Sequence, residues 1–207
     1  MADAIELFSA PRRVHGGRGS RASTTAAAER ALFVDLATEL DVPIASVSDA
    51  TLDRIGAVLD PGLEAANPLD AWGRGSTPTG SSGSRSWPST IDDEVAAMAL
   101  RRRPDAPGRA VRRGYLQVAR DVWAATTKPF CVLSNLSAAV AADERGCSAT
   151  TRIPVLEGTP SGLSALKHLL DDADVAAATE PRPRPAAVPE QRSLIVAIAP
   201  RHGEPAR

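Results

Sequence analysis

Residues 29–59 read ERALFVDLATELDVPIASVSDATLDRIGAVL, and this stretch decides the fold. Its first part carries a leucine at every fourth position, which predicts a helix with one apolar face, capped by Thr24 or Thr25. The leucines of that face are Leu32, Leu36 and Leu40. Pro43 prevents the helix from continuing, so we expect it to end by Asp41.

A strand and a second helix follow within the same stretch. Residues 43–47 form a short apolar run, which is typical of a buried strand. Ser48 caps a helix that runs to about Leu59, and Pro61-Gly62 stops it. A helix, a buried strand and a helix in this order favour an α/β fold with a parallel sheet.

A second block of regular pattern lies further along the chain. Its predicted elements are a helix over 115–127, strands over 130–134 and 153–156, and a helix that opens at Thr159-Pro160. The strand over 130–134 has the clearest pattern in the sequence. We expect the two blocks to share one sheet, with Ile44 and Val132 on its strands.

The composition limits how much of the chain can fold. Leu, Ile, Val and Phe make about a fifth of the 207 residues and aromatic residues only 3%, so we expect a small core. Lys and Arg number 24 against 25 Asp and Glu, a balance that argues against a nucleic-acid partner. With no signal-peptide pattern and no membrane-spanning run, the sequence predicts a cytoplasmic protein without a membrane partner.

Three parts are predicted along the chain: a flexible segment over 1–23, an α/β domain over 24–172, and a Pro/Ala/Arg-rich tail over 173–207. Within the domain, residues 73–113 are predicted to be irregular because Gly, Ser, Pro and Arg dominate them. Residues 95–100 fit a helix and a strand equally well. The arginines between 101 and 113 are interpreted as a solvated, disordered run.

Four residues are candidates for a ligand-proximal site, and each has a structural alternative. Asn67 and Asp70 flank a turn, where they either order a loop near a nucleotide or phosphate, or bond their own backbone in an Asx-type turn. We favour the turn. Ser134 and Asn135 follow the clearest strand, at the edge where α/β sheets usually bind ligands, although a simple turn is the default interpretation.

No histidine or cysteine shows the neighbours that catalysis requires, so no catalytic residue is predicted. His15, His168 and His202 are each interpreted as solvated surface residues. Cys131 lies within an apolar strand and is predicted to be a buried thiol with a raised pKa, while Cys147 has no assigned role. Two cysteines are too few for a typical zinc site, so no metal site is predicted.

The regular stretches resemble, in the same order, one domain of the NDP-forming acyl-CoA synthetases, the family of acetate–CoA ligase and succinyl-CoA synthetase. The most specific parts are Asn67-Pro68-Leu69-Asp70, and Ile153-Pro154-Val155-Leu156 with Gly158-Thr159. The resemblance covers residues 29–73 and 121–172 and falls on the second succinyl-CoA-ligase-like domain. It implies a partial flavodoxin-like (Rossmann-like) three-layer domain with irregular insertions and disordered tails.

The resemblance also implies a reaction. Full-length members join an acid and CoA with hydrolysis of ATP, giving acyl-CoA, ADP and phosphate. ATP with Mg and CoA are the cofactors implied for the full-length family, and none is expected in this chain. The implied partners are ATP-grasp and CoA-binding domains or subunits of the same enzyme. We therefore expect a fragment that is not catalytic alone; the alternative is a non-catalytic α/β binding or interaction module.

This sequence departs from the family pattern at residues 18–28 and 74–113, and the similarity lapses again at residues 144–151 and after 172. The family has a strand directly before the helix at Glu29, where residues 18–28 show no strand pattern. It also has a helix, a strand and a loop where this chain has residues 74–113. Stretches that match the family alternate with stretches rich in Arg, Pro, Gly and Ser. Such alternation is typical of shifted reading frames in GC-rich DNA, so we hypothesise a frame-disrupted gene fragment. Translating the neighbouring frame across residues 73–113 tests this, and the absence of a family-like helix and strand there contradicts it.

Overall fold

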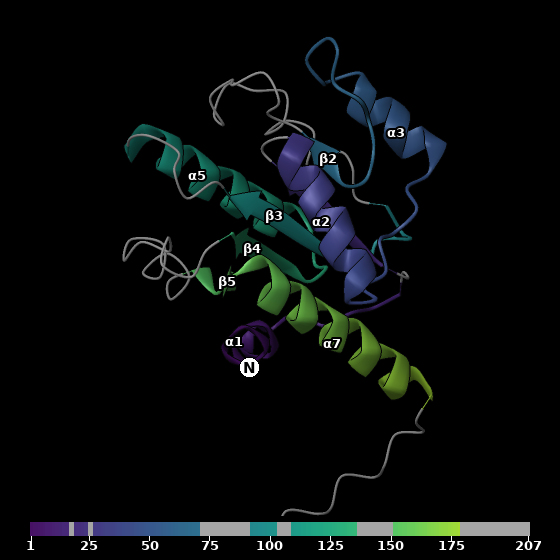
Figure 1. Ribbon diagram of the computed structural model, residues 1–207, viewed down its shortest axis with the longest axis vertical. Coiled ribbons are helices and arrows are strands. Elements are labelled where there is room, and N and C mark those ends of the chain that lie inside the picture. Colours follow the sequence, from purple (N-terminus) through teal and green to yellow (C-terminus); the bar gives the residue numbers. More distant parts are fainter. Residues whose placement is uncertain (17–18, 25–26, 71–91, 103–108, 136–150, 179–207) are drawn as a thin grey trace, which may run out of the picture.

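The computed structural model describes residues 1–16, 19–24, 27–70, 92–102, 109–135 and 151–178, and centres on a five-stranded parallel sheet (Figure 1). The strands are β1 (Ser20–Thr24), β2 (Leu69–Asp70), β3 (Ala97–Arg102), β4 (Phe130–Ser134) and β5 (Val155–Glu157). They lie in the order β2-β1-β3-β4-β5, and every pair is parallel. This is the strand order of a flavodoxin-like, doubly wound α/β fold.

Helices cover both faces of the sheet, which confirms the predicted three-layer α/β class. The described helices are α1 (Ala2–Ser9), α2 (Ala27–Glu39), α3 (Asp49–Gly56), α5 (Arg109–Ala125) and α7 (Thr159–Ala178). Side chains of α3 and α5 pack on one face of the sheet, and those of α1, α2 and α7 pack on the other. Each face therefore has its own hydrophobic core.

Strand β3 shows how the two cores are divided. Met98 and Leu100 face α3 and α5, whereas Ala97 and Ala99 face α2 and α7, as the alternation of a strand requires. Residues 97–101 of the strand are buried because it lies between β1 and β4 and has helices on both faces. Its small alanine side chains let the helices of the second core approach the sheet closely.

The N-terminal segment contains regular structure, which corrects the prediction that residues 1–23 are flexible. Helix α1 packs against α7 and β5, with Leu7 in the core. The Asp3 carboxylate, only 5% exposed, accepts hydrogen bonds from the Glu157 main-chain N–H (2.8 Å) and the Ser161 hydroxyl (2.6 Å). A buried aspartate in a short helix leaves no apolar pattern, so this contact is visible only once α7 lies beside α1.

Strand β1 occupies the place where no strand was expected. It pairs with both β2 and β3, and Ala22, Ser23 and Thr24 are fully buried. Apart from Arg21 its side chains are small, and only Ala22 is apolar, so it lacks the Val/Ile/Leu enrichment that normally marks a central parallel strand. Thr24 therefore ends a strand rather than capping a helix, and α2 begins at Ala27.

The region predicted to be irregular also contains regular elements. Strand β3 settles the ambiguity of residues 95–100 in favour of a strand and continues through Arg102, while α5 begins at Arg109. Arg101 and Arg102 thus belong to a central strand and not to a solvated run. Helix α7 extends to Ala178, beyond the predicted domain end. The predictions made for residues 73–91, 103–108, 138–144 and 179–207 lie outside the described residues.

Residues 43–47 join the sheet through one isolated bridge, between Ile44 and Ser20 of β1. The Ser20 N–H donates to the Pro43 carbonyl at 2.8 Å, and the Ala45 N–H donates to the Ser20 carbonyl at 2.9 Å. Since β1 and β4 belong to the same sheet, Ile44 and Val132 are connected through it. The two sequence blocks therefore share one sheet, as predicted, but the predicted strand over residues 43–47 is only an isolated bridge.

Asp92 ties the start of β3 to the start of α3. Its carboxylate, in a residue only 7% exposed, accepts hydrogen bonds from the Ser48 hydroxyl (2.6 Å), the Ser48 N–H (3.0 Å) and the Glu94 N–H (3.1 Å). The bond from the Ser48 hydroxyl contributes most to holding the pKa of Asp92 well below its ordinary value, although burial acts in the opposite direction. The ionised carboxylate is therefore the form that the fold stabilises.

We expect Asp92→Asn to lower the free energy of unfolding by about 2 kcal/mol at pH 7, because hydrogen bonds to a charged group are lost. The pKa of Asp92 is lower in the folded than in the unfolded chain, so its contribution is complete above the ordinary pKa of 3.8 and is lost as the pH falls below that value. Urea unfolding of wild type and variant should therefore show a smaller difference at pH 3 than at pH 7, by about 1 kcal/mol. An equal difference at both pH values contradicts this assignment.

Candidate functional site

The candidate site lies at the carboxyl edge of the sheet, between β1 and β3. The chain leaves β1 into α2 on one face of the sheet and leaves β3 towards α5 on the other face. Neighbouring strands with connections on opposite faces define the switch point of a doubly wound sheet, where such folds bind ligands. The fold therefore predicts where a ligand or partner group would lie.

A buried arginine occupies this edge. Arg101, at the end of β3, has a side chain with 0% exposure. Its Nε donates to Asn135 Oδ1, its Nη1 donates to the Glu29 carbonyl, and its Nη2 donates to Thr159 Oγ1 at 3.4 Å. Asn135 Nδ2 also donates to Glu29 Oε1 at 2.9 Å. These four residues, the Arg101 cluster, join β3, the end of β4 and the first turns of α2 and α7.

The electrostatics of the Arg101 cluster favour negative charge nearby. Burial lowers the pKa of Arg101, while the charge of Glu29 acts in the opposite direction. A guanidinium nevertheless stays charged at neutral pH. The starts of α2 and α7 add the positive ends of two helix dipoles at the same edge. The cluster can position helix starts and attract an anion, but it contains no nucleophile paired with a base.

Three of the four predicted site residues lie at this carboxyl edge: Ser134, Asn135 and Asp70, which ends β2 beside Thr24 at the end of β1. Ser134 is the last residue of β4, is 1% exposed and is paired in register with Arg102 and Glu157. Asn135 follows it, and its side chain bonds residues of β3 and α2 rather than closing a local turn. The sequence interpretation thus found the correct edge of the sheet, and a role in ligand binding stays a proposal.

Asn67 lies outside the Arg101 cluster. Its Oδ1 accepts a hydrogen bond from the Ala22 N–H (3.1 Å), and its Nδ2 donates to the carbonyls of Ser20 (3.1 Å) and Ala45 (2.8 Å). The side chain therefore links β1 to the segment at Ala45. These bonds correct the favoured interpretation for Asn67, a turn in which the side chain bonds its own neighbouring backbone. Asp70 ends β2, paired in register with Thr24.

Sequence reasoning missed three members of the cluster, Arg101, Glu29 and Thr159. A signal for Arg101 was present, because this charged residue directly follows an apolar run that ends at Leu100. A charge at the carboxyl end of a buried parallel strand lies where ligand sites form. Glu29 and Thr159 show no comparable signal, since acidic and threonine residues are common in the first turns of helices.

The remaining candidates carry no chemistry in the described residues. Cys131 is fully buried, and burial, with a smaller contribution from Asp3, raises its pKa to about 12, so the prediction of an inert thiol is confirmed. His15 and His168 are exposed, while His202 and Cys147 lie outside the described residues. Among the residues that the structure describes, no group of three or more His, Cys, Asp or Glu could hold a metal ion. No helix in the described ranges has the length and apolar character needed to cross a bilayer.

The described elements define a flavodoxin-like α/β domain, and solved structures share this fold. PH0766 from Pyrococcus horikoshii OT3 superposes with a TM-score of 0.65 at 16% identity, over 84% of this chain and 40% of that protein. The dinucleotide-forming acetyl-coenzyme A synthetase 1 of Ca. Korarchaeum cryptofilum is also similar. Its apo form gives a TM-score of 0.57 at 14% identity, over 86% of this chain and 39% of the synthetase.

The complex of the same synthetase with phosphate and ADP gives a TM-score of 0.60 at 14% identity, over 87% of this chain and 39% of the synthetase. The present chain therefore spans about two fifths of the length of these proteins. No family model and no curated protein matches the sequence. The likeness, which includes an acetyl-coenzyme A synthetase as the sequence resemblance implied, is one of fold.

Proposed function

We propose that this chain is the second succinyl-CoA-ligase-like domain of an NDP-forming acyl-CoA synthetase, and that it contributes an interdomain surface rather than catalysis by itself. The observation that carries the proposal is the superposition of at least 84% of the chain on two fifths of each of two solved proteins, one of them an acetyl-coenzyme A synthetase. The order of sequence motifs, read without the structure, favours the same family. The reaction is acid, CoA and ATP giving acyl-CoA, ADP and phosphate.

The Arg101 cluster gives the domain a physical role within that enzyme. It fixes the starts of α2 and α7 beside each other at the switch point, so the positive ends of both helix dipoles lie at one edge of the sheet. Helix starts held in this way stabilise phosphate or another anion that a neighbouring domain brings to the edge. We infer that ATP with Mg and CoA bind partner domains or subunits of the ATP-grasp and CoA-binding types. The enzyme is proposed to be cytoplasmic.

A reconstitution assay tests this function. The chain is co-expressed with the ATP-grasp, CoA-binding and first flavodoxin-like polypeptides encoded in the same genome, and formation of acetyl-CoA and ADP from acetate, CoA and MgATP is measured. We expect turnover only when this chain is present. Turnover at an equal rate without it would overturn the proposal.

Calorimetric titration of the isolated chain separates the two candidate functions. A domain that only supplies a surface should show no saturable heat with CoA or with MgATP, yet it should unfold cooperatively on heating. Saturable binding of either compound by the chain alone would instead support the alternative, a stand-alone α/β binding module.

A further inference from the structure

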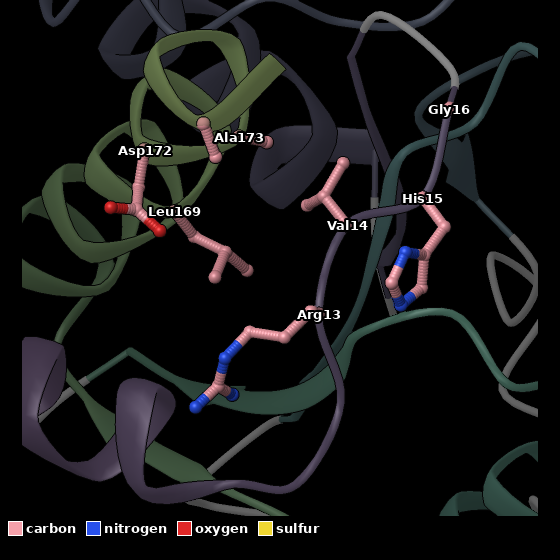
Figure 2. A pocket seen from close by; sticks show the side chains of 8 residues that line it. Arg13, Val14, His15, Gly16, Leu169, Asp172 and Ala173 are labelled. Atoms are coloured by element: carbon pink, nitrogen blue, oxygen red, sulfur yellow. The ribbon is translucent and has the colours of Figure 1, made fainter. Parts of the chain in front are cut away.

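A hollow lies away from the Arg101 cluster, between residues 13–16 and the C-terminal half of α7 (Figure 2). Its volume is about 380 Å³, near the lower end of the range for ligand pockets. It is lined by Arg13, Val14, His15, Gly16, Leu169, Asp172, Ala173 and Ala176. Figure 2 shows Leu169 and Asp172 extending from α7 towards the segment that carries Arg13.

The guanidinium of Arg13 has its orientation fixed but part of its hydrogen-bonding capacity unused. Its Nη1 donates to the carbonyls of Ala10 and Arg12, and its Nη2 donates to the Phe8 carbonyl at 3.2 Å. A guanidinium has five N–H groups. Within the described part of the chain, the Nε–H and one Nη2 N–H of Arg13 therefore have no acceptor. Adjacent N–H donors of this kind match the two oxygens of a carboxylate.

Asp172 brings the opposite charge to the same hollow. Its side chain is exposed and forms no hydrogen bond or ion pair with any residue that the structure describes, Arg13 included. A ligand with only a carboxylate would be repelled by Asp172, and a ligand with only an amine would be repelled by Arg13. The pair therefore selects for a ligand that carries both charges.

Apart from His15, the rest of the lining is apolar. Leu169 is buried and Val14 is half-buried. Helix α7 adds the small side chains of Ala173 and Ala176. These groups bury an aliphatic side chain but offer it no hydrogen bond. A hollow with one cation, one anion and an aliphatic wall has the chemistry of an amino-acid site.

We propose that this hollow binds a free α-amino acid with an aliphatic side chain. The ligand carboxylate pairs with Arg13, its ammonium group pairs with Asp172, and its side chain packs on Leu169 and Val14. The site is separate from the Arg101 cluster, and this proposal does not depend on the function proposed above.

The first test is an NMR titration of the full chain, labelled with ¹⁵N, with three probes that share the same aliphatic side chain. L-leucine carries both charges, 4-methylpentanoate lacks the ammonium group, and 3-methylbutylamine lacks the carboxylate. We expect saturable shifts at residues 13–16 and 169–176 with L-leucine, and affinities at least about tenfold weaker for the other two probes. No saturable shift with L-leucine, or equal affinities for all three probes, would overturn the proposal.

The second test uses charge-changing variants. Asp172→Asn should weaken L-leucine binding about tenfold and strengthen 4-methylpentanoate binding, because it removes both an attraction and a repulsion. Arg13→Gln should weaken both, whereas Arg30→Gln, which removes an arginine elsewhere on the surface, should change neither. If Arg13→Gln fails to fold, the Asp172→Asn variant still tests the site, because Asp172 is exposed. A fall in affinity for both probes in Asp172→Asn, or no change in either, contradicts the site.

Discussion

Replacing Arg101 by methionine is expected to lower the free energy of unfolding by about 3 kcal/mol, and the melting temperature by about 5–12 °C. Methionine fills much of the same space but donates no hydrogen bond. Asn135 Oδ1, the Glu29 carbonyl and Thr159 Oγ1 would each lose a donor, and the charge of Glu29 would lose its nearby cation. Urea unfolding followed by circular dichroism measures the loss.

Two further variants show whether the loss of stability comes from the buried N–H donors of the Arg101 guanidinium. Arg101→Lys keeps the charge but cannot reach three acceptors in one plane, so it should lie between wild type and Arg101→Met. Arg30→Gln removes a half-buried surface arginine that pairs with the exposed Glu64 at 3.1 Å, and should cost no more than about 1 kcal/mol. If Arg101→Met is no less stable than Arg30→Gln, the cluster does not hold the two helices together.

Gly19→Ala is the second substitution with a large expected effect. A Cβ at this position would lie 2.6 Å from the Ala45 nitrogen, 2.8 Å from Ala45 Cα and 3.0 Å from the Ile44 carbonyl carbon. These are main-chain atoms, which cannot rotate away as a side chain can. The added methyl must displace the segment bridged to β1 and strain its bonds to Ser20. We expect a loss of about 2–3 kcal/mol in the free energy of unfolding.

Gly56→Ala is the matched control for Gly19→Ala. Gly56 ends α3, and a Cβ there would approach no atom closer than the Ala65 Cβ at 4.0 Å. Alanine favours a helix over glycine, so this variant should be neutral or more stable by up to about 1 kcal/mol. Thermal unfolding of the two variants side by side separates the effect of close approach from that of losing a glycine. Equal melting temperatures would show that the strand and the 44–45 segment can move apart freely.

The sequence was most informative where apolar side chains repeat. The strand predicted over 130–134 matches β4 in every residue, because all five positions are buried between two cores. The helix from Ser48 matches α3 closely at its start. In such stretches the hydrophobic period and the turn residues agree, so local pattern and tertiary packing give the same answer.

The sequence pattern did not predict burial where that burial depends on residues that are distant in the chain. Ser20, Ala22, Ser23 and Thr24 of β1 are buried between neighbouring strands although these side chains are small and mostly polar. Arg101 is buried because Asn135 and Glu29, far away in the chain, satisfy it. Neither effect leaves a periodic signal, so both stretches resembled linkers. The hypothesis of a frame-disrupted gene stays a prediction, but it no longer has support from a missing strand before α2.

The contact between Asp3 and α7 has a consequence for how the protein is made. Its two hydrogen bonds join residues 154 and 158 positions apart in the chain. At a translation rate of roughly 5–20 residues per second, the first helix waits on the order of ten seconds before its partner leaves the ribosome. During that interval Leu7 and its apolar neighbours are uncovered on the nascent chain, and a chaperone that shields them would raise the yield of folded protein.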